Sequence, residues 1–354
     1  MLSGSLFCGL PPQGESIKVC RCATKKTFMN ICIMGAGAWG TALAIHFAHH
    51  GHPVALWTHN ADHAAVLAAE RCNRRYLPDF DFPPALAVLA QLPAAADLVI
   101  VATPVAGLRS SAVALQAAGL GQVPVLAACK GVGQGTGLLP QQVLADVLAG
   151  NGCIGLLSGP SFAQELAQQL PCAVTLAAAN LSWIKTLSGA LNTPVLRLYA
   201  NQDVVGVAVG GAVKNVMAIA TGIADGLNYG MNARAALMTR GLAEISRLSL
   251  ALGAEATTLM GLAGMGDLIL TCTGSLSRNR RVGLMLAEGK NLQQILLELG
   301  HVAEGVYTID EAQRQAQQLG VDMPVVQVLH DLIHGKIDVA AVAEVLMDRR
   351  PKVE

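Results

Sequence analysis

Aromatic side chains are scarce in this chain of 354 residues. Phe, Trp and Tyr make up 4% of the residues, although 53% are hydrophobic, so small aliphatic side chains must build the core. Close packing of helices against strands and other helices favours such side chains. The chain is also too long for one ordinary hydrophobic core, and we therefore expect two domains.

An excess of charge of either sign is also absent. The 24 Lys and Arg residues balance the 24 Asp and Glu residues, so no general field gathers nucleic acid or an anionic membrane. The charge-free segment 110–129 is interrupted by Gly119, Gly121 and Pro124, whereas a spanning helix needs about 20 mainly apolar residues. We expect a buried strand from Val123 and no stable membrane insertion.

Cysteine pairs with the spacing of a zinc or redox site are missing. The nine cysteines are scattered, their number is odd, and none forms a CxxC motif. This pattern predicts a reduced, cytoplasmic protein without a disulfide framework or a bound metal. Residues 1–28 contain an apolar run, Leu6 to Leu10, that is too short for a signal peptide. We expect a disordered extension here, with a transit peptide or a true start at Met29 as alternatives.

The chain then opens with a strand, a glycine turn, a helix and a second strand. An apolar run ends at Met34, the turn reads Gly35-Ala-Gly37-Ala-Trp-Gly40, and a second apolar run covers 54–57. In a dinucleotide-binding turn the first glycine permits the bend, the second admits the pyrophosphate and the third packs the helix on the sheet. A bare motif could be only a turn, but this context favours phosphate binding at the helix N-terminus.

More short buried strands follow, and helical stretches separate most of them. We expect strands at 98–102, 123–128, 154–157, 174–177 and 195–199. Beyond Tyr199 the pattern becomes helical, and we expect helices at 204–224, 233–252, 281–288, 292–298, 308–319, 325–334 and 339–348. The fold class is therefore α/β, a Rossmann-like doubly wound parallel sheet over 29–198 followed by an all-α domain over 199–350.

Several polar residues occupy positions where chemistry is expected, and each has a plainer explanation. His59 follows the second strand where NAD-specific enzymes carry an acidic residue, so it favours acceptance of NADPH, or it is a surface residue. Lys130 follows a strand end and either meets an anion or is simply exposed. Lys214 lies in an apolar helix, where burial lowers its pKa and suits a general base, unless its ammonium reaches solvent.

Two glycine-rich breaks in the second half hold the remaining candidates. Asp267 is framed by glycines in Gly264-Met-Gly266-Asp267. The segment from Ser277 to Arg281 places three arginines within four residues at the start of a helix. Guanidinium groups and free backbone N–H groups together would bind a phosphate, although a solvated basic turn has the same composition.

Eight short motifs in this order resemble bacterial-type glycerol-3-phosphate dehydrogenases from Met29 to about Arg350. They are Gly35-Ala-Gly-Ala-Trp-Gly-Thr-Ala-Leu-Ala44, Asn73-Arg-Arg-Tyr-Leu-Pro78, Cys129-Lys-Gly131, Ser158-Gly-Pro-Ser-Phe-Ala163, Val213-Lys-Asn215, Gly264-Met-Gly-Asp-Leu268, Ser277-Arg-Asn279 and Val302-Ala-Glu-Gly305. The resemblance implies reversible hydride transfer between NAD(P)H and dihydroxyacetone phosphate, giving sn-glycerol 3-phosphate for glycerophospholipid synthesis. It also implies a helical domain like the C-terminal domain of 6-phosphogluconate dehydrogenase.

The resemblance also implies residue roles. Lys214 would be the catalytic proton acceptor. The substrate would be held by Lys130, Gly159, Ser161, Lys214, Asp267, Ser277, Arg278 and Asn279. The cofactor, NADP or NAD, would be held by Gly35, Gly37, Ala38, Trp39, Gly40, His59, Lys130, Ala163, Arg278, Val302 and Glu304. Two positions depart mildly from the family pattern, because Ser161 stands where Thr is common and Ala38 where Ser also occurs.

Other functions stay open at this point. A ketopantoate or β-hydroxyacid type dehydrogenase also pairs a Rossmann domain with a helical domain and a lysine, but the Ser277-Arg278-Asn279 segment favours a phosphorylated substrate. A non-catalytic dinucleotide sensor would need no buried Lys214 facing Asp267. We expect a small phosphorylated molecule as partner and no nucleic acid, and the sequence leaves a homodimer open.

Overall fold

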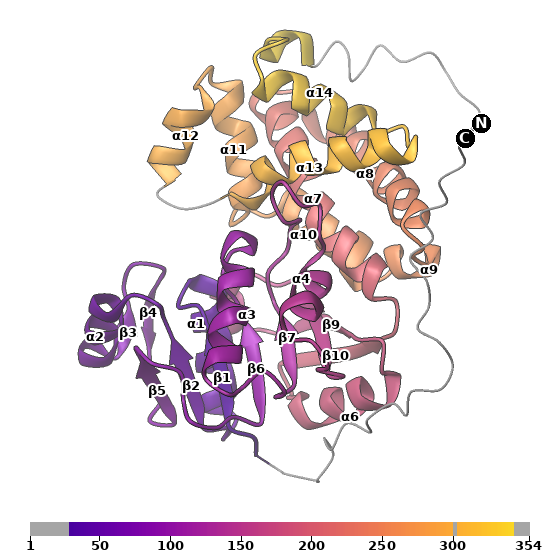
Figure 1. The fold of residues 1–354 in the computed structure, drawn as a ribbon. Helices are drawn as coiled ribbons and strands as arrows, with labels where there is room; N and C mark the ends of the chain where they lie inside the picture. Colours follow the sequence, from indigo (N-terminus) through magenta and orange to yellow (C-terminus); the bar gives the residue numbers. More distant parts are fainter. Residues whose placement is uncertain (1–27, 300–302, 343–354) are drawn as a thin grey trace, which may run out of the picture.

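The structure is a computed structural model that describes residues 28–299 and 303–342. Its first half is built on one eight-stranded sheet with the order β10-β9-β8-β7-β6-β1-β2-β5 (Figure 1). The strands are β1 (Ile31–Met34), β2 (Val54–Trp57), β5 (Leu86–Leu89), β6 (Leu98–Val101), β7 (Val125–Ala127), β8 (Ile154–Ser158), β9 (Cys172–Ala177) and β10 (Leu196–Asn201). All seven strands expected in this sheet form, whereas β5 was not expected.

Helices cover both faces of the sheet, because alternate residues of the central strands point to opposite sides. Cys32 and Met34 of β1 share a core with α3 (Leu108–Ala117) and α4 (Pro140–Val147). Ile31 and Ile33 share the other core with α1 (Ala38–His49), α5 (Ala163–Ala167) and α6 (Leu181–Leu191). This two-sided burial confirms the predicted doubly wound arrangement.

One pairing departs from a purely parallel sheet. Strand β9 runs antiparallel to β8, with Leu156 opposite Ala177, while the remaining neighbours in the sheet are parallel. The segment that joins these two strands contains only the five-residue helix α5. The short antiparallel hairpin of β3 (Cys72–Asn73) and β4 (Leu77–Asp81) lies apart from the main sheet, after helix α2 (Ala61–Glu70).

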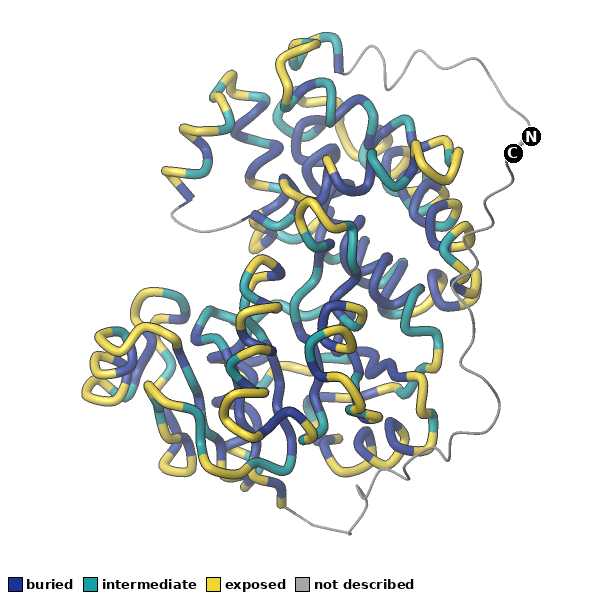
Figure 2. The backbone as a smooth tube through the Cα atoms, in the orientation of Figure 1, coloured by how far each residue is buried: buried dark blue, intermediate teal, exposed yellow. Residues whose placement is uncertain are grey.

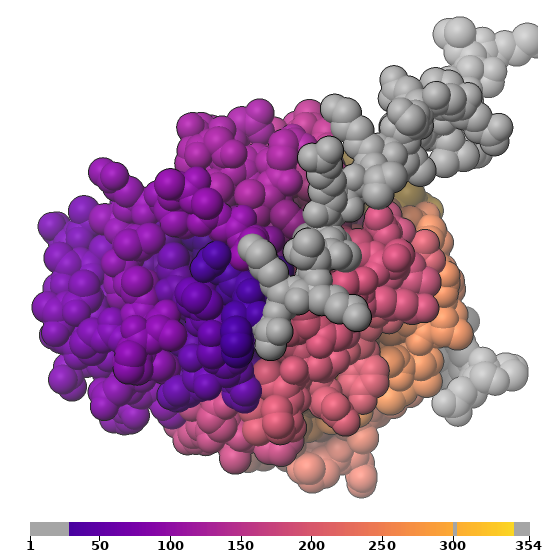
Figure 3. All heavy atoms as spheres, turned by 90° about the horizontal axis from the view of Figure 1, so that it is seen from below, coloured from indigo at the N-terminus to yellow at the C-terminus, as the bar shows by residue number. Residues whose placement is uncertain are grey.

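The second half is helical and packs around α7 (Val204–Gly226). This helix is buried over most of its length (Figure 2). Around it lie α8 (Gly230–Ala251), α9 (Ala256–Leu259), α10 (Asp267–Thr273), α11 (Arg278–Ala287), α12 (Leu292–Leu299), α13 (Glu304–Leu319) and α14 (Pro324–Ile333). A view turned by 90° shows the sheet half in front and the orange helices at the edge (Figure 3). The predicted helix at 339–348 lies mostly outside the described residues.

Two apolar stretches are long enough to cross a membrane by composition alone, Val204–Gly226 and Ala256–Thr273. The window in the first is 89% buried inside the protein, so this helix is the centre of a folded core. The segment 110–129 instead forms the end of α3 and strand β7, as expected. Five cysteines are free (Cys32, Cys72, Cys129, Cys172 and Cys272), but Cys153 is disulfide-bonded, so the prediction of a wholly reduced chain is wrong there.

Candidate functional site

The glycine turn between β1 and α1 has the shape that a dinucleotide phosphate requires. Gly35 has φ of +110°, a conformation that side chains disfavour. A Cβ on Gly40 would lie 2.0 Å from the Gly35 carbonyl oxygen, whereas a Cβ on Gly37 would meet nothing within 4 Å. The helix therefore packs tightly at Gly40 and leaves open space at its N-terminus, where backbone N–H groups bind anions.

Two further features of this turn fit a nicotinamide cofactor. Ala38 and Trp39 begin α1, and the indole Nε1 of Trp39 is buried without a hydrogen-bond partner. Asn73 of the hairpin donates from Nδ2 to the Ala36 carbonyl at 2.9 Å and to Thr41 Oγ1 at 2.8 Å. The buried Asn73 amide thus fixes the hairpin against the glycine turn, which gives the Asn73-Arg-Arg-Tyr motif a structural role.

One arginine and two histidines lie close together beyond the end of β2. His59 is exposed, as is Arg75, which lies over the ring of Tyr76. Burial lowers the pKa of His63, and the charges of Arg75 and His59 lower it further, so these three groups lie close in space. The Arg75 guanidinium beside His59 suits a 2′-phosphate better than an unphosphorylated ribose.

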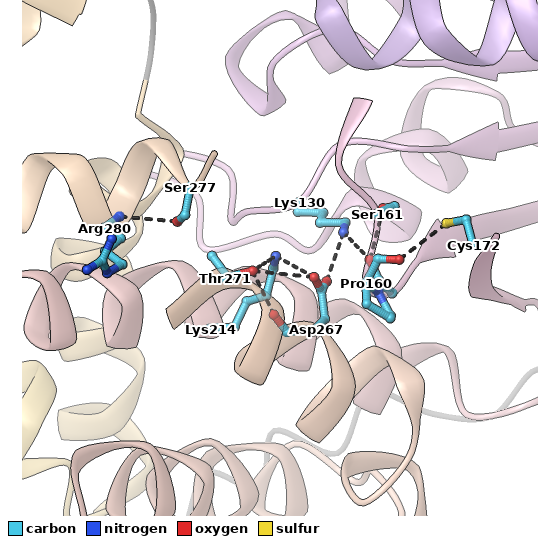
Figure 4. A network of polar contacts seen from close by, with 10 residues as sticks. Lys130, Pro160, Ser161, Cys172, Lys214, Asp267, Thr271, Ser277 and Arg280 are labelled. Atoms are coloured by element: carbon cyan, nitrogen blue, oxygen red, sulfur yellow. Dashed lines mark hydrogen bonds and ion pairs between the residues drawn. The ribbon is translucent and has the colours of Figure 1, made fainter. Parts of the chain in front are cut away.

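Lys214, Asp267 and Lys130 form the centre of the second cluster (Figure 4). Asp267 begins α10 and is 1% exposed, and its Oδ1 accepts from Lys214 Nζ at 2.6 Å. Its Oδ2 accepts from Lys130 Nζ at 2.8 Å. One buried carboxylate therefore holds two ammonium groups, one from the helical half and one from the end of β7.

This arrangement tunes the proton affinity of Lys214. Burial lowers its pKa from the usual range to about 8, Asp267 opposes that shift, and the charge of Lys130 adds to it. Burial disfavours a charged amine, and the neighbouring carboxylate restores part of the loss. A pKa close to the working pH lets one group both release and accept a proton.

The backbone before Asp267 explains how the carboxylate reaches both lysines. A π-helical turn, Leu262–Gly266, leads directly into α10, and such turns are frequent at functional sites. A Cβ on Gly264 would lie 2.1 Å from the carbonyl oxygen of Leu259, so only glycine fits there. Gly266 meets nothing closer than 3.6 Å, so the first of the two framing glycines is the sterically required one.

Thr271 was missed in the sequence analysis. Its Oγ1 accepts from Lys214 Nζ at 2.6 Å and donates to the Asp267 carbonyl at 2.6 Å. The available signal was its position four residues after Asp267, which places both side chains on one face of a helix. Thr271 thereby fixes the direction of the Lys214 ammonium.

The end of β8 contributes the third side of this cluster. The carbonyl of Gly159 accepts from Lys130 Nζ at 2.8 Å and from Ser161 Oγ at 2.9 Å. Gly159 has φ of +140°, and a Cβ there would lie 3.0 Å from Val174 Cα. Ala163 begins the short helix α5 immediately afterwards. The structure therefore brings together five predicted substrate residues, Lys130, Gly159, Ser161, Lys214 and Asp267.

The three arginines at the start of α11 have different environments. Ser277 caps the helix by accepting from the Arg280 backbone N–H. Arg280 binds Asp225 at 2.7 Å, so its guanidinium is already paired with a carboxylate. Arg281 is exposed. Among the described residues the Arg278 guanidinium has no hydrogen-bond partner, which leaves its donors available to an anion.

Arg278 faces the beginning of α13. Although the side chain is exposed, the surrounding protein lowers its pKa by desolvation, and Glu304 opposes this shift. The Glu304 carboxylate accepts from the Val105 backbone N–H at 3.1 Å and lies against Gly131 beside Lys130. Asn279 Oδ1 accepts from the Gly305 N–H at 3.0 Å. Val302, the remaining predicted cofactor residue, lies outside the described residues.

Comparison with known proteins identifies the family. Residues 30–184 match the model of the NAD-dependent glycerol-3-phosphate dehydrogenase N-terminus, and residues 203–344 match that of its C-terminus. The chain belongs to the NAD-dependent glycerol-3-phosphate dehydrogenase family. It is 60% identical to glycerol-3-phosphate dehydrogenase [NAD(P)+] of Neisseria meningitidis serogroup C over 92% of this chain and all of that protein. The protein of the same name from Dechloromonas aromatica is 55% identical over 92% of this chain and 99% of its own length.

Solved structures agree with this family assignment. The glycerol-3-phosphate dehydrogenase of Coxiella burnetii superposes with a TM-score of 0.85 at 38% identity, covering 92% of this chain and all of that one. A probable 2-dehydropantoate 2-reductase from Bacillus subtilis reaches a TM-score of 0.51 at 14% identity over 89% of this chain and 99% of its own. This likeness to the reductase shows a shared fold and nothing more. It therefore gives no support to a ketopantoate reductase activity for this chain.

Proposed function

We propose that this protein catalyses reversible hydride transfer between NAD(P)H and dihydroxyacetone phosphate, giving sn-glycerol 3-phosphate. The observation that carries the proposal is the Lys214–Asp267–Lys130 cluster in a member of this family, in which Lys214 and Asp267 are buried and Lys130 is partly buried. A non-catalytic sensor would gain nothing from a buried lysine and a partly buried lysine on one buried carboxylate, because burying such charges costs free energy.

In this proposal Lys214 carries the reacting proton at Nζ. When bound, the nicotinamide cofactor supplies the hydride to the central carbon of the substrate. Lys214 donates its proton to the carbonyl oxygen during reduction and takes the hydroxyl proton during oxidation. Asp267 and Thr271 aim the ammonium through bonds of 2.6 Å each, and a well-placed group of this kind contributes about 10²–10⁴-fold in rate.

The remaining residues bind and orient the ligands. Arg278 binds the substrate phosphate through donors that none of the residues in 28–299 and 303–342 occupies. Lys130, Gly159, Ser161, Ser277 and Asn279 border the same substrate. Holding the remote phosphate fixes the reacting carbon relative to the nicotinamide, and orientation of this kind lowers the barrier. The cofactor is held by Gly35, Gly37, Ala38, Trp39, Gly40, His59, Lys130, Ala163, Arg278, Val302 and Glu304. Among these residues, His59 favours NADPH over NADH.

Several wider assignments accompany the reaction. The product is the glycerol backbone of phospholipids, so we place the enzyme in glycerophospholipid synthesis. We also propose that it acts in the cytoplasm, and a homodimer stays a prediction. We place the domain boundary near residue 198. The dinucleotide-binding domain then covers residues 29–198, and the helical domain that carries the proton donor covers residues 199–350.

One assay separates this function from its rivals. Purified protein is mixed with NADPH or NADH, and oxidation of the cofactor is followed with dihydroxyacetone phosphate, with ketopantoate or without substrate. We expect the cofactor to be oxidised in the presence of dihydroxyacetone phosphate and in neither of the other two mixtures. Oxidation with ketopantoate would identify the rival dehydrogenase, and cofactor binding without turnover on any substrate would indicate a sensor.

A further inference from the structure

Three side chains with metal-ligating atoms converge between α13 and α14, away from the lysine cluster. His330 lies on α14, His334 is the residue that directly follows this helix one turn later, and Asp310 lies on α13. Helices α13 and α14 are neighbours in Figure 1. Residues spaced by four share one face of a helix, so both imidazoles face the same neighbour. The ligand atoms of the three residues all lie within 4.8 Å of one another.

The separations of these atoms suit a common metal ion. The Asp310 Oδ1 lies 2.8 Å from His334 Nε2 and 3.8 Å from His330 Nε2. An ion bound at about 2.0–2.2 Å by nitrogen and oxygen in tetrahedral geometry separates its ligands by roughly 3.4 Å. The observed distances lie on both sides of that value, so small side-chain rotations suffice. All three residues are exposed or partly exposed, which gives an ion access from solvent.

A second carboxylate supports this arrangement from behind. The Nδ1 of His330 lies 3.4 Å from Asp331 Oδ1, on the side of the ring away from Asp310. Asp331 is held by Gln327 Nε2 at 2.8 Å and by Lys336 Nζ at 2.9 Å. Histidines that bind metals commonly donate their other ring nitrogen to such a carboxylate, which fixes the tautomer and the ring orientation.

A second histidine pair in the chain has the same spacing but lacks these features. His46 and His50 also lie one turn apart on and beside α1, and their rings are 4.4 Å apart. His46 is fully buried, with its Nε2 at 3.2 Å from Thr193 Oγ1, and the His50 Nδ1 faces the His46 carbonyl at 2.8 Å. Spacing alone therefore does not produce a ligand set, and this pair provides an internal control.

We propose that Asp310, His330 and His334 bind one divalent transition metal ion of the Zn²⁺ type. Two imidazoles and one carboxylate favour such borderline ions over Mg²⁺ or Ca²⁺, which prefer oxygen ligands. The bound ion joins α13 to α14 and so stabilises the helical half of the protein. Because α13 begins at Glu304, which contacts the Val105 loop, the ion also secures a helix that reaches the substrate cluster. This inference is independent of the proposed reaction.

The experiment uses the full-length protein after treatment with a chelator. Zn²⁺ binding is measured by calorimetry, and Co²⁺ is added separately to record its visible absorption. Wild type and the control variant His50→Gln are compared with His334→Gln and with the isosteric Asp310→Asn. We expect one equivalent of Zn²⁺, a Co²⁺ spectrum without a sulfur-to-metal charge-transfer band, and a higher melting temperature with metal.

The variants decide the outcome. His334→Gln and Asp310→Asn should lose at least roughly tenfold in Zn²⁺ affinity and most of the thermal shift, whereas His50→Gln keeps both. Asp331→Asn should also weaken binding, by about 10–100-fold, because it removes the carboxylate that orients the His330 ring. Binding that survives both His334→Gln and Asp310→Asn, or a cysteine-type Co²⁺ spectrum, would overturn the proposal. Dehydrogenase activity of the same samples, measured separately, reports on the proposed function alone.

Discussion

Replacing Asp267 with asparagine should shift the pH dependence of the reaction toward acid. The Asp267 carboxylate raises the pKa of Lys214, which burial has lowered to about 8. Asparagine keeps the shape and a hydrogen-bond acceptor but removes the charge. An opposite charge at this range moves a pKa by about 1–3 units, so the pKa of Lys214 should fall by that amount in the variant.

The size of the effect follows from the protonated fraction of Lys214. At about pH 7.5, a one-unit fall from 8 takes that fraction from about 76% to about 24%, and a two-unit fall takes it to about 3%. In the proposed mechanism, reduction of dihydroxyacetone phosphate needs the protonated amine. Its kcat/KM at this pH should therefore drop about 3-fold for the one-unit fall and about 25-fold for the two-unit fall. The drop should shrink as the pH is lowered, because Lys214 then regains its proton.

The assay is the pH profile of kcat/KM for dihydroxyacetone phosphate reduction in wild type, Asp267→Asn and Thr271→Val. Thr271→Val removes a neutral hydrogen bond to Lys214 and leaves the Asp267 carboxylate. The kcat/KM of this variant should therefore fall, while the pH at which its profile declines on the alkaline side stays at the wild-type value. A constant loss of rate in Asp267→Asn with an unmoved alkaline limb would refute the reasoning. In that case Lys214 would not be the titrating group, or Asp267 would act only in substrate binding.

Four further predictions concern single residues. Lys214→Ala should lower turnover by about 10²–10⁴-fold, while NADPH affinity measured by fluorescence stays near wild type; normal turnover would remove Lys214 from the mechanism. Arg278→Ala should cost on the order of 10–100-fold in kcat/KM with dihydroxyacetone phosphate and less with unphosphorylated dihydroxyacetone. Arg278→Lys should recover only part, and an equal loss on both substrates would place the phosphate elsewhere. His59→Asp should reduce the preference for NADPH over NADH in dissociation constants, and an unchanged ratio would contradict the role of His59. Glu244 is buried against the Val325 N–H, and burial raises its pKa to about 7. Its contribution to stability is therefore present below its unfolded pKa near 4.5 and is lost as the pH rises through 7. Glu244→Gln should make the free energy of urea unfolding depend less on pH between these two values, and an unchanged pH dependence would count against this role.

The sheet was largely predictable because each central strand is a short run of buried aliphatic residues. Leu98–Val101 is buried at every position, and a short, wholly apolar run of this kind is typical of a strand in a parallel sheet that is covered on both faces. Strand β5 was missed because it lies at the sheet edge, with Ala87 exposed and Pro83 and Pro84 just before it. The direction of β9 was also not predictable, because a buried strand shows the same apolar pattern in parallel and antiparallel pairing.

The polar site was less predictable, since its members come together only in the folded chain. The Lys130–Asp267 ion pair spans 137 residues, and the Val105–Glu304 hydrogen bond spans 199. Residue types and local motifs suggested candidates and one pairing, Lys214 with Asp267, but gave no reason to bring Lys130 to the same carboxylate. The family resemblance supplied the roles, while the geometry supplied what it lacked, namely that Asp267 bridges both lysines and that Thr271 aims one of them.

The arginine-rich start of α11 shows how the folded structure separates similar residues. By composition and position alone, Arg278, Arg280 and Arg281 are equally suited to a phosphate, and only the family resemblance singles out Arg278. Asp225 binds Arg280 and also Arg234, so it ties α11 to the end of α7 and withdraws one guanidinium from ligand binding. Both lysines of the cluster are likewise bonded to Asp267. Arg278 has Glu304 as a nearby charge but no hydrogen-bonding partner among the residues described, so a bound phosphate would satisfy donors that the protein itself leaves free. The proposed function therefore gives phosphate recognition and proton transfer to different groups, and we predict that substitution separates the two.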